Sequence, residues 1–86
     1  MKEFRLRISS PEGDLFSGDI VQLNVRASGG DIAILAGHIP FISYVKPGSC
    51  SLVLADGTEK EFELDGGALT VGREKTILLT GGLTWR

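Results

Sequence analysis

Eighty-six residues with a formal net charge of −2 form a chain of one domain's length. The slight acidity argues against a nucleic-acid binder, which needs a basic face for phosphates. The apolar share of 42% excludes a disordered tail, the single cysteine excludes an internal disulfide, and no apolar run is long enough for a membrane span or a secretory signal.

Short stretches in which apolar and polar residues alternate follow one another along the chain, separated by glycine or proline turns. This period of two is typical of strands with one buried face. In chain order, strands are predicted at 4–9, 15–17, 21–27, 31–35, 41–45, 52–54, 59–64, 69–71 and 76–80. Gly18-Asp19 is expected to break the chain between the second and third of these, and Asp56-Gly57 to close a hairpin.

No window shows helical apolar spacing free of glycine, so the sequence predicts an all-β fold. About eight to ten short strands suit a two-layer β-sandwich or a small barrel, with residues 1–86 as a single domain.

Few residues offer chemistry. His38 is the only histidine, so a histidine pair for a metal is absent and a loop or interface role is favoured. Cys50 lies beside a strand and is expected to be a small buried hydrophobe. Glu59, Glu61 and Glu63 alternate along one strand and are interpreted as a solvated face. The residues therefore predict no catalytic site, no metal and no cofactor.

Apolar side chains are more abundant than one buried face requires. The segments 32–35, 52–54 and 77–79 are apolar on both sides, and the loop 36–42 is apolar where loops are normally polar. A contiguous exposed apolar patch usually marks a protein contact, although these residues could instead plug the ends of the sandwich. Trp85 either caps the edge of the core or anchors a partner.

Five stretches, in order and at matching separations, carry a resemblance to a known family. They are Phe4-Arg5-Leu6-Arg7-Ile8-Ser9-Ser10-Pro11-Glu12-Gly13, Leu15-Phe16-Ser17-Gly18-Asp19, Gly30-Asp31-Ile32-Ala33-Ile34-Leu35-Ala36-Gly37-His38-Ile39-Pro40, Lys46-Pro47-Gly48 and Asp65-Gly66-Gly67-Ala68-Leu69-Thr70-Val71. Over nearly its whole length the chain resembles the N-terminal β-sandwich domain of the epsilon subunit of F-type ATP synthases.

The resemblance implies a ten-stranded sandwich on the central rotor stalk that performs no catalysis. Its partners would be the gamma subunit and the ring of c subunits, and its role would be to couple proton or sodium translocation to ATP synthesis. It implies a gamma surface at the histidine turn, with His38, Ile39, Phe41 and Ile42, and a contact of Asp31 with the polar loops of the ring. The protein would lie at the cytoplasmic side of the bacterial inner membrane, held there by the complex without inserting itself.

Two departures from the family pattern qualify what the resemblance implies. Ala36 stands where the family commonly has proline before Gly-His, which frees the backbone of the loop. The helical hairpin that follows the sandwich in most bacterial members, and that can inhibit ATP hydrolysis, is not in these residues. A complete chain would be a short member without that brake, whereas a fragment would simply lack it.

Two other classes of function are weighed against the rotor subunit. A stand-alone β-sandwich that binds a protein or a ligand such as a sugar would need a groove lined with aromatic and polar groups, and the chain has few aromatic residues. A small enzyme would need an acid/base pair, a nucleophile or a metal site, and no such set is found in the sequence.

Overall fold

The chain folds into strands joined by short turns, as the period-two pattern predicts. A computed structural model describes residues 2–27, 29–37 and 39–86. The strands are β1 (Phe4–Ser10), β2 (Gly13–Ala27), β3 (Gly30–Leu35), β4 (Phe41–Val45), β5 (Gly48–Leu54), β6 (Glu59–Leu64), β7 (Gly67–Val71), β8 (Lys75–Thr80) and β9 (Leu83–Trp85). The residues that the structure describes contain no helix, and hence none that could span a membrane. The all-β prediction is confirmed.

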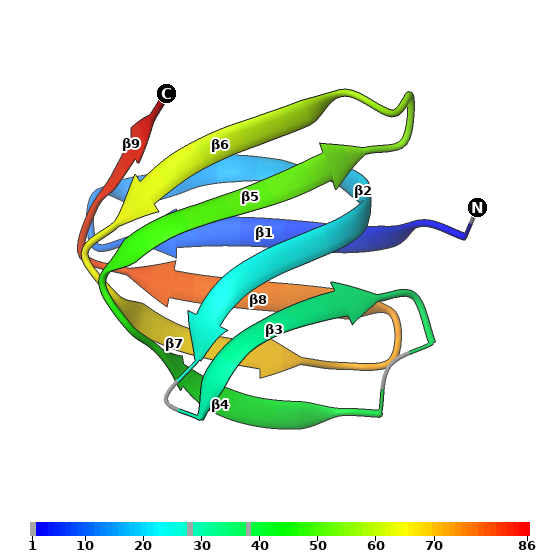
Figure 1. Cartoon of the computed structure of the whole chain (residues 1–86), viewed down its shortest axis with the longest axis horizontal. Coiled ribbons are helices and arrows are strands. Elements are labelled where there is room, and N and C mark those ends of the chain that lie inside the picture. Colours follow the sequence, from blue (N-terminus) through cyan, green and yellow to red (C-terminus); the bar gives the residue numbers. More distant parts are fainter. Residues whose placement is uncertain (1, 28, 38) are drawn as a thin grey trace.

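Two layers share one long strand (Figure 1). The first layer runs from the first half of β2 through β1, β8 and β7 to β4. The second runs from β3 through the second half of β2 and β5 to β6 and β9. All neighbours are antiparallel except β1 and β8, which run parallel in the middle of the first layer. In Figure 1 β2 starts behind β5 and curves into the front layer.

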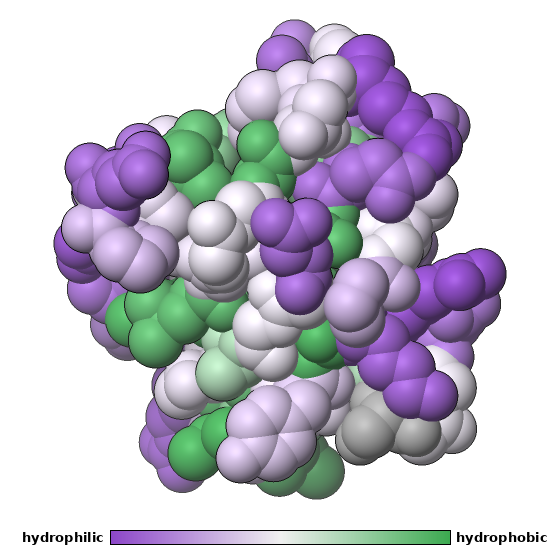
Figure 2. Space-filling view, turned by 90° about the vertical axis from the view of Figure 1, so that its left-hand side faces the viewer, coloured by the Kyte–Doolittle hydropathy of each residue, from purple (hydrophilic) through white to green (hydrophobic). Residues whose placement is uncertain are grey.

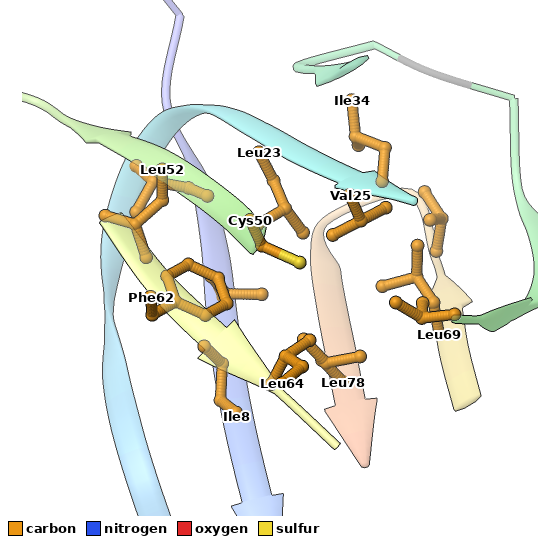
Figure 3. Packing of buried hydrophobic residues seen from close by; sticks show 14 of the residues in the cluster. Ile8, Leu23, Val25, Ile34, Cys50, Leu52, Phe62, Leu64, Leu69 and Leu78 are labelled. Atoms are coloured by element: carbon orange, nitrogen blue, oxygen red, sulfur yellow. The ribbon is translucent and has the colours of Figure 1, made fainter. Parts of the chain in front are cut away.

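The core lies between the two layers and collects every second residue of the strands. Figure 3 shows side chains from β1, β7 and β8 pointing towards those from β2, β5 and β6. Ile8, Leu52, Phe62 and Leu78 are fully buried there. Because neighbouring residues of a strand point to opposite faces, the same alternation that marks the strands also selects the core.

The expected break at Gly18-Asp19 is wrong, because β2 runs without interruption through both residues. A Cβ on Gly18 would approach the ring of Phe16 to 3.3 Å, so the glycine provides room for that ring within the strand. The chain bends slightly later, where the pairing of β2 with β5 shifts register between Ile20 and Gln22. Such a bulge sharpens the local twist, and it lets one strand pass from the first layer to the second.

The end of the chain closes one side of the sandwich. The Trp85 ring lies 5.4 Å from that of Phe62 and 6.0 Å from that of Phe16, measured between ring centroids. The side chain of Arg86 forms an ion pair with Glu63 and donates a 2.9 Å hydrogen bond to Ser49. Trp85 therefore caps the edge of the core, the first of the two roles considered for it.

Candidate interaction surface

The outer side of the first layer carries apolar side chains where a solvated sheet would be polar. Ile42 and Tyr44 on β4 are 78% and 77% exposed, and Leu79 on β8 is 53% exposed. Ala68 on β7 and Ile77 on β8 are half-buried between them. These five residues are called the apolar face below.

Strand register places the apolar face in two rows across β4, β7 and β8. Tyr44 pairs with Ala68, and Ala68 pairs with Leu79, which forms one row. In the other row, Thr70 stands between Ile42 and Ile77. Side chains directly opposite one another in a sheet lie within contact distance, so the residues of each row form one continuous surface.

A cleft extends the apolar face at one end. It has a volume of about 420 Å³ and lies between the turn after β1 and the end of β8. Leu79 belongs both to the apolar face and to the lining of this cleft, together with Pro11. The surface is therefore a sheet face that ends in a depression. Figure 2 looks at the side of the molecule that lies on the left in Figure 1, and it shows apolar surface reaching solvent there in several places between polar groups.

The loop before β4 adds one further exposed apolar side chain. Ile39 is 80% exposed and precedes Ile42 by only three residues. Phe41 is only partly exposed and packs against the core, because alternation along β4 turns it away from Ile42. His38 lies outside the described residues. The structure thus brings Ile39 and Ile42 to the surface and packs Phe41 against the core.

Asp31, the residue expected to meet the c-ring, lies at the start of β3. Its side chain is 80% exposed, and one carboxylate oxygen lies 3.8 Å from Nε of Arg26 on β2. An ion pair this long and this exposed stabilises the fold very little. The Asp31 carboxylate is accordingly available to a partner.

The outer side of the second layer has the opposite character. Gln22 donates a 2.8 Å hydrogen bond to Asn24, and Asn24 donates a 3.0 Å hydrogen bond to Ser51 on β5. The surface here forms an open groove of about 460 Å³, with Arg26 and Arg86 among its lining residues. Because polar side chains already pair with one another across these strands, this side is suited to water.

Reactive groups are scarce on either side. Burial raises the pKa of the Cys50 thiol, which disfavours the nucleophilic thiolate. No group of three or more histidine, cysteine or acidic side chains that could hold a metal occurs among residues 2–27, 29–37 and 39–86. What the described residues offer is an apolar surface for binding.

Sequence reasoning missed Tyr44, Ala68 and the exact place of Leu79. Tyr44 follows Ile42 at a spacing of two, so extending the alternation along β4 would have found it. The run 77–79, apolar on both sides, was a signal for Leu79, but its distance from Ile42 depends on strand pairing.

Comparison with known proteins identifies relatives over almost the whole chain. Residues 3–86 match the family described as "ATP synthase, Delta/Epsilon chain, beta-sandwich domain". The chain is 41% identical over 76 residues to the ATP synthase epsilon chain of Dichelobacter nodosus, covering 88% of this chain and 53% of the relative. It is 38% identical over 82 residues to the sodium ion specific ATP synthase epsilon chain of Acetobacterium woodii, covering 95% and 62%.

The fold has a counterpart in a solved structure, a chain of the mitochondrial ATP synthase of Euglena gracilis in an assembly of OSCP, F1 and c-ring. The TM-score is 0.91 at 16% identity, over 96% of this chain and 53% of that chain. At this identity the match establishes a shared fold. The chain spans between about half and two thirds of the length of the relatives that it matches.

Proposed function

Because this chain belongs to the family of ATP synthase delta/epsilon chain β-sandwich domains, we propose that it is a non-catalytic subunit of the central stalk of an F-type ATP synthase. In this role it binds the gamma subunit and the ring of c subunits, and it couples ion translocation to ATP synthesis. It needs no cofactor, because its contribution is mechanical. It lies as a peripheral subunit at the cytoplasmic side of the bacterial inner membrane, held there by its partners.

The apolar face is the observation that carries this proposal. Exposed Ile42, Tyr44 and Leu79 on one side of a small acidic domain are costly in water and favour a permanent contact. We assign this face, together with Ile39, to gamma. His38 was expected in the same contact, and it stays part of the proposal on the strength of the family resemblance alone.

The gamma contact is tested by placing a charge on the apolar face. Ile42→Lys and Tyr44→Lys lower the affinity for gamma by about 100-fold or more, because the ammonium group is buried without a partner at the contact. Affinity is measured by calorimetric titration of purified gamma. Because both side chains are largely exposed, the free variants keep the circular dichroism spectrum of the parent chain.

The matched control is Thr84→Lys, which adds the same charge to an exposed residue of β9 in the other layer. Its affinity for gamma stays at the parent value. If the variants on the apolar face bind gamma as tightly as the control does, gamma docks elsewhere and the assignment is wrong.

The c-ring contact is assigned to Asp31. A charge contact at the rim of an interface is worth about 0–1 kcal/mol, so Asp31→Ala weakens binding to purified c-ring by at most about fivefold. Asp31→Lys reverses the charge and weakens it further. Equal binding by both variants and the parent would remove Asp31 from the interface.

The function as a whole is tested by reconstitution. An ATP synthase preparation depleted of its epsilon subunit regains ion-coupled turnover when this chain is added. Ile42→Lys, which fails to bind gamma, does not restore it. A chain that binds neither gamma nor the c-ring and restores nothing is no rotor subunit.

A further inference from the structure

Strand β3 presents an open edge. It pairs with β2 on one side, and no other backbone partner of β3 is found among the described residues. Its sequence, Gly-Asp-Ile-Ala-Ile-Leu, contains neither lysine nor proline, and its register with β2 has no bulge. Natural proteins avoid a regular, apolar, unpaired edge of this kind because such an edge adds strands from other chains.

The opposite side of the sandwich shows that this chain does protect its edges elsewhere. At the first half of β2, Asp14 and Asp19 face Arg7 and Arg5 of β1. In the second layer the edge strand is β9, which is only three residues long and carries Trp85 over the core. Charged side chains, a short edge strand and an aromatic cap protect that side of the sandwich. The centre of β3 has none of these three features.

Side chains along β3 also favour an added strand. Leu35 is exposed, Ile32 is only partly buried against the core, and Ala33 is small and exposed on the outer side. A strand laid beside β3 would cover Leu35 and Ile32 while it pairs with the backbone.

We propose that β3 accepts an extended strand of the gamma subunit, which adds to the second layer of the sandwich by backbone pairing. This inference rests on the proposed function for the identity of the partner. The position of β3 supports the assignment, since the strand leads directly into the loop with Ile39 and then into β4 with Ile42. The occupant is a β-strand of alternating apolar character.

Hydrogen exchange of the backbone amides tests the pairing itself. Alternate amides of an edge strand point away from its only neighbour. In the free chain, those of β3 exchange quickly, whereas the interleaved amides bonded to β2 exchange slowly. On binding of gamma, the fast set slows by about tenfold or more, and NMR resolves the alternation residue by residue.

The outcomes separate this proposal from the proposed function. If gamma binds and the fast amides of β3 stay fast, the contact is made by side chains alone, and strand addition is wrong while the rotor assignment stands. If gamma does not bind, both fail. If the amides of β3 slow in the free chain as its concentration rises, a second copy occupies the edge, which also overturns the proposal.

A variant provides a second test. Ala33→Lys places a charge on the exposed outer side of β3, a substitution that natural edge strands use against added strands. It lowers the affinity for gamma by about tenfold while the circular dichroism spectrum is unchanged. Thr84→Lys on β9 is the control. Equal affinity of the two variants contradicts strand addition at β3.

Discussion

Gly67, the first residue of β7, lies so close to β8 that only a glycine fits. A Cβ at this position would stand 2.0 Å from the carbonyl oxygen of Leu79, which belongs to the backbone and cannot rotate away. Gly67→Ala therefore lowers the free energy of unfolding by about 3 kcal/mol, the upper part of the usual range for overpacking.

Chemical denaturation measures this loss, and Gly81→Ala is the matched control, because its added Cβ meets nothing within 4 Å. The control changes stability by less than about 1 kcal/mol. Equal stability of the two variants would show that β7 and β8 can move apart freely.

Cys50 is a buried thiol that reports on opening of the fold. Its side chain is 5% exposed, and burial raises its pKa. A thiol reagent such as Ellman's reagent therefore reacts with the native chain about 100-fold or more slowly than with the denatured chain. Rapid labelling of the native protein would mean that β5 opens locally at this residue.

At the scale of single residues, alternation predicts which side chains are exposed only when it is known where in the strand the alternation begins. Ile42 was expected at the surface and is found there, whereas its neighbour Phe41 packs inward. An apolar loop that runs into a strand gives no signal for the residue at which alternation begins. In the core strands apolar and polar residues strictly alternate. Burial was predictable there, because the alternation itself shows which residues face the core.

Among the elements, the hairpin of β1 and β2 depends on a small polar network. The Ser9 hydroxyl donates a 2.8 Å hydrogen bond to Asp14, and Arg7 donates one of 3.0 Å to the same oxygen. These two hydrogen bonds hold the pKa of the Asp14 carboxyl below its ordinary value of 3.8, and the bond from Ser9 has the larger effect. The network stabilises the folded state while Asp14 is ionised.

Because the folded pKa of Asp14 is the lower one, this stabilisation is complete above pH 3.8 and is lost as the pH falls through the folded value. Denaturation midpoints at pH 6 and at about pH 2.5 therefore fall further apart for the parent chain than for Asp14→Asn. Ser9→Ala, which removes the first donor, has an intermediate effect. Identical pH dependence of the parent and Asp14→Asn would exclude a role of the network in stability.

Pairing between elements is the part of the fold that the sequence hides. The Asp56-Gly57 turn predicted the hairpin of β5 and β6, because the hairpin depends on local geometry. The parallel pairing of β1 and β8 leaves no local trace, since the two strands are far apart in the sequence. The apolar face depends on the pairing of β4 with β7 and of β7 with β8, so it could not be assembled from the sequence alone.

For the whole molecule, the passage of β2 through both layers predicts cooperative unfolding. Neither layer can open while the other keeps β2 in place, because Leu6 and Leu52, one in each layer, pack into a single core with residues of β2. We therefore expect residues 1–86 to unfold in one transition. Far-UV circular dichroism and Trp85 fluorescence then give coincident denaturation curves.

Truncating the core tests the same cooperativity. Phe62→Ala lowers the free energy of unfolding by about 3–5 kcal/mol and shifts both curves together. Curves that separate, in the parent or in this variant, would show two independently folding layers.

The parallel contact of β1 with β8 also determines when the protein can become native during its synthesis. Residues 4–10 leave the ribosome well before residues 75–80, which are their neighbour in the first layer. Until those residues emerge, the hairpin of β1 and β2 has one unpaired side and its apolar residues remain uncovered. Contacts of such high sequence separation place folding in the range of about milliseconds to seconds. The nascent chain is therefore exposed to chaperones and to aggregation until residues 75–80 have been synthesised and can pair with β1.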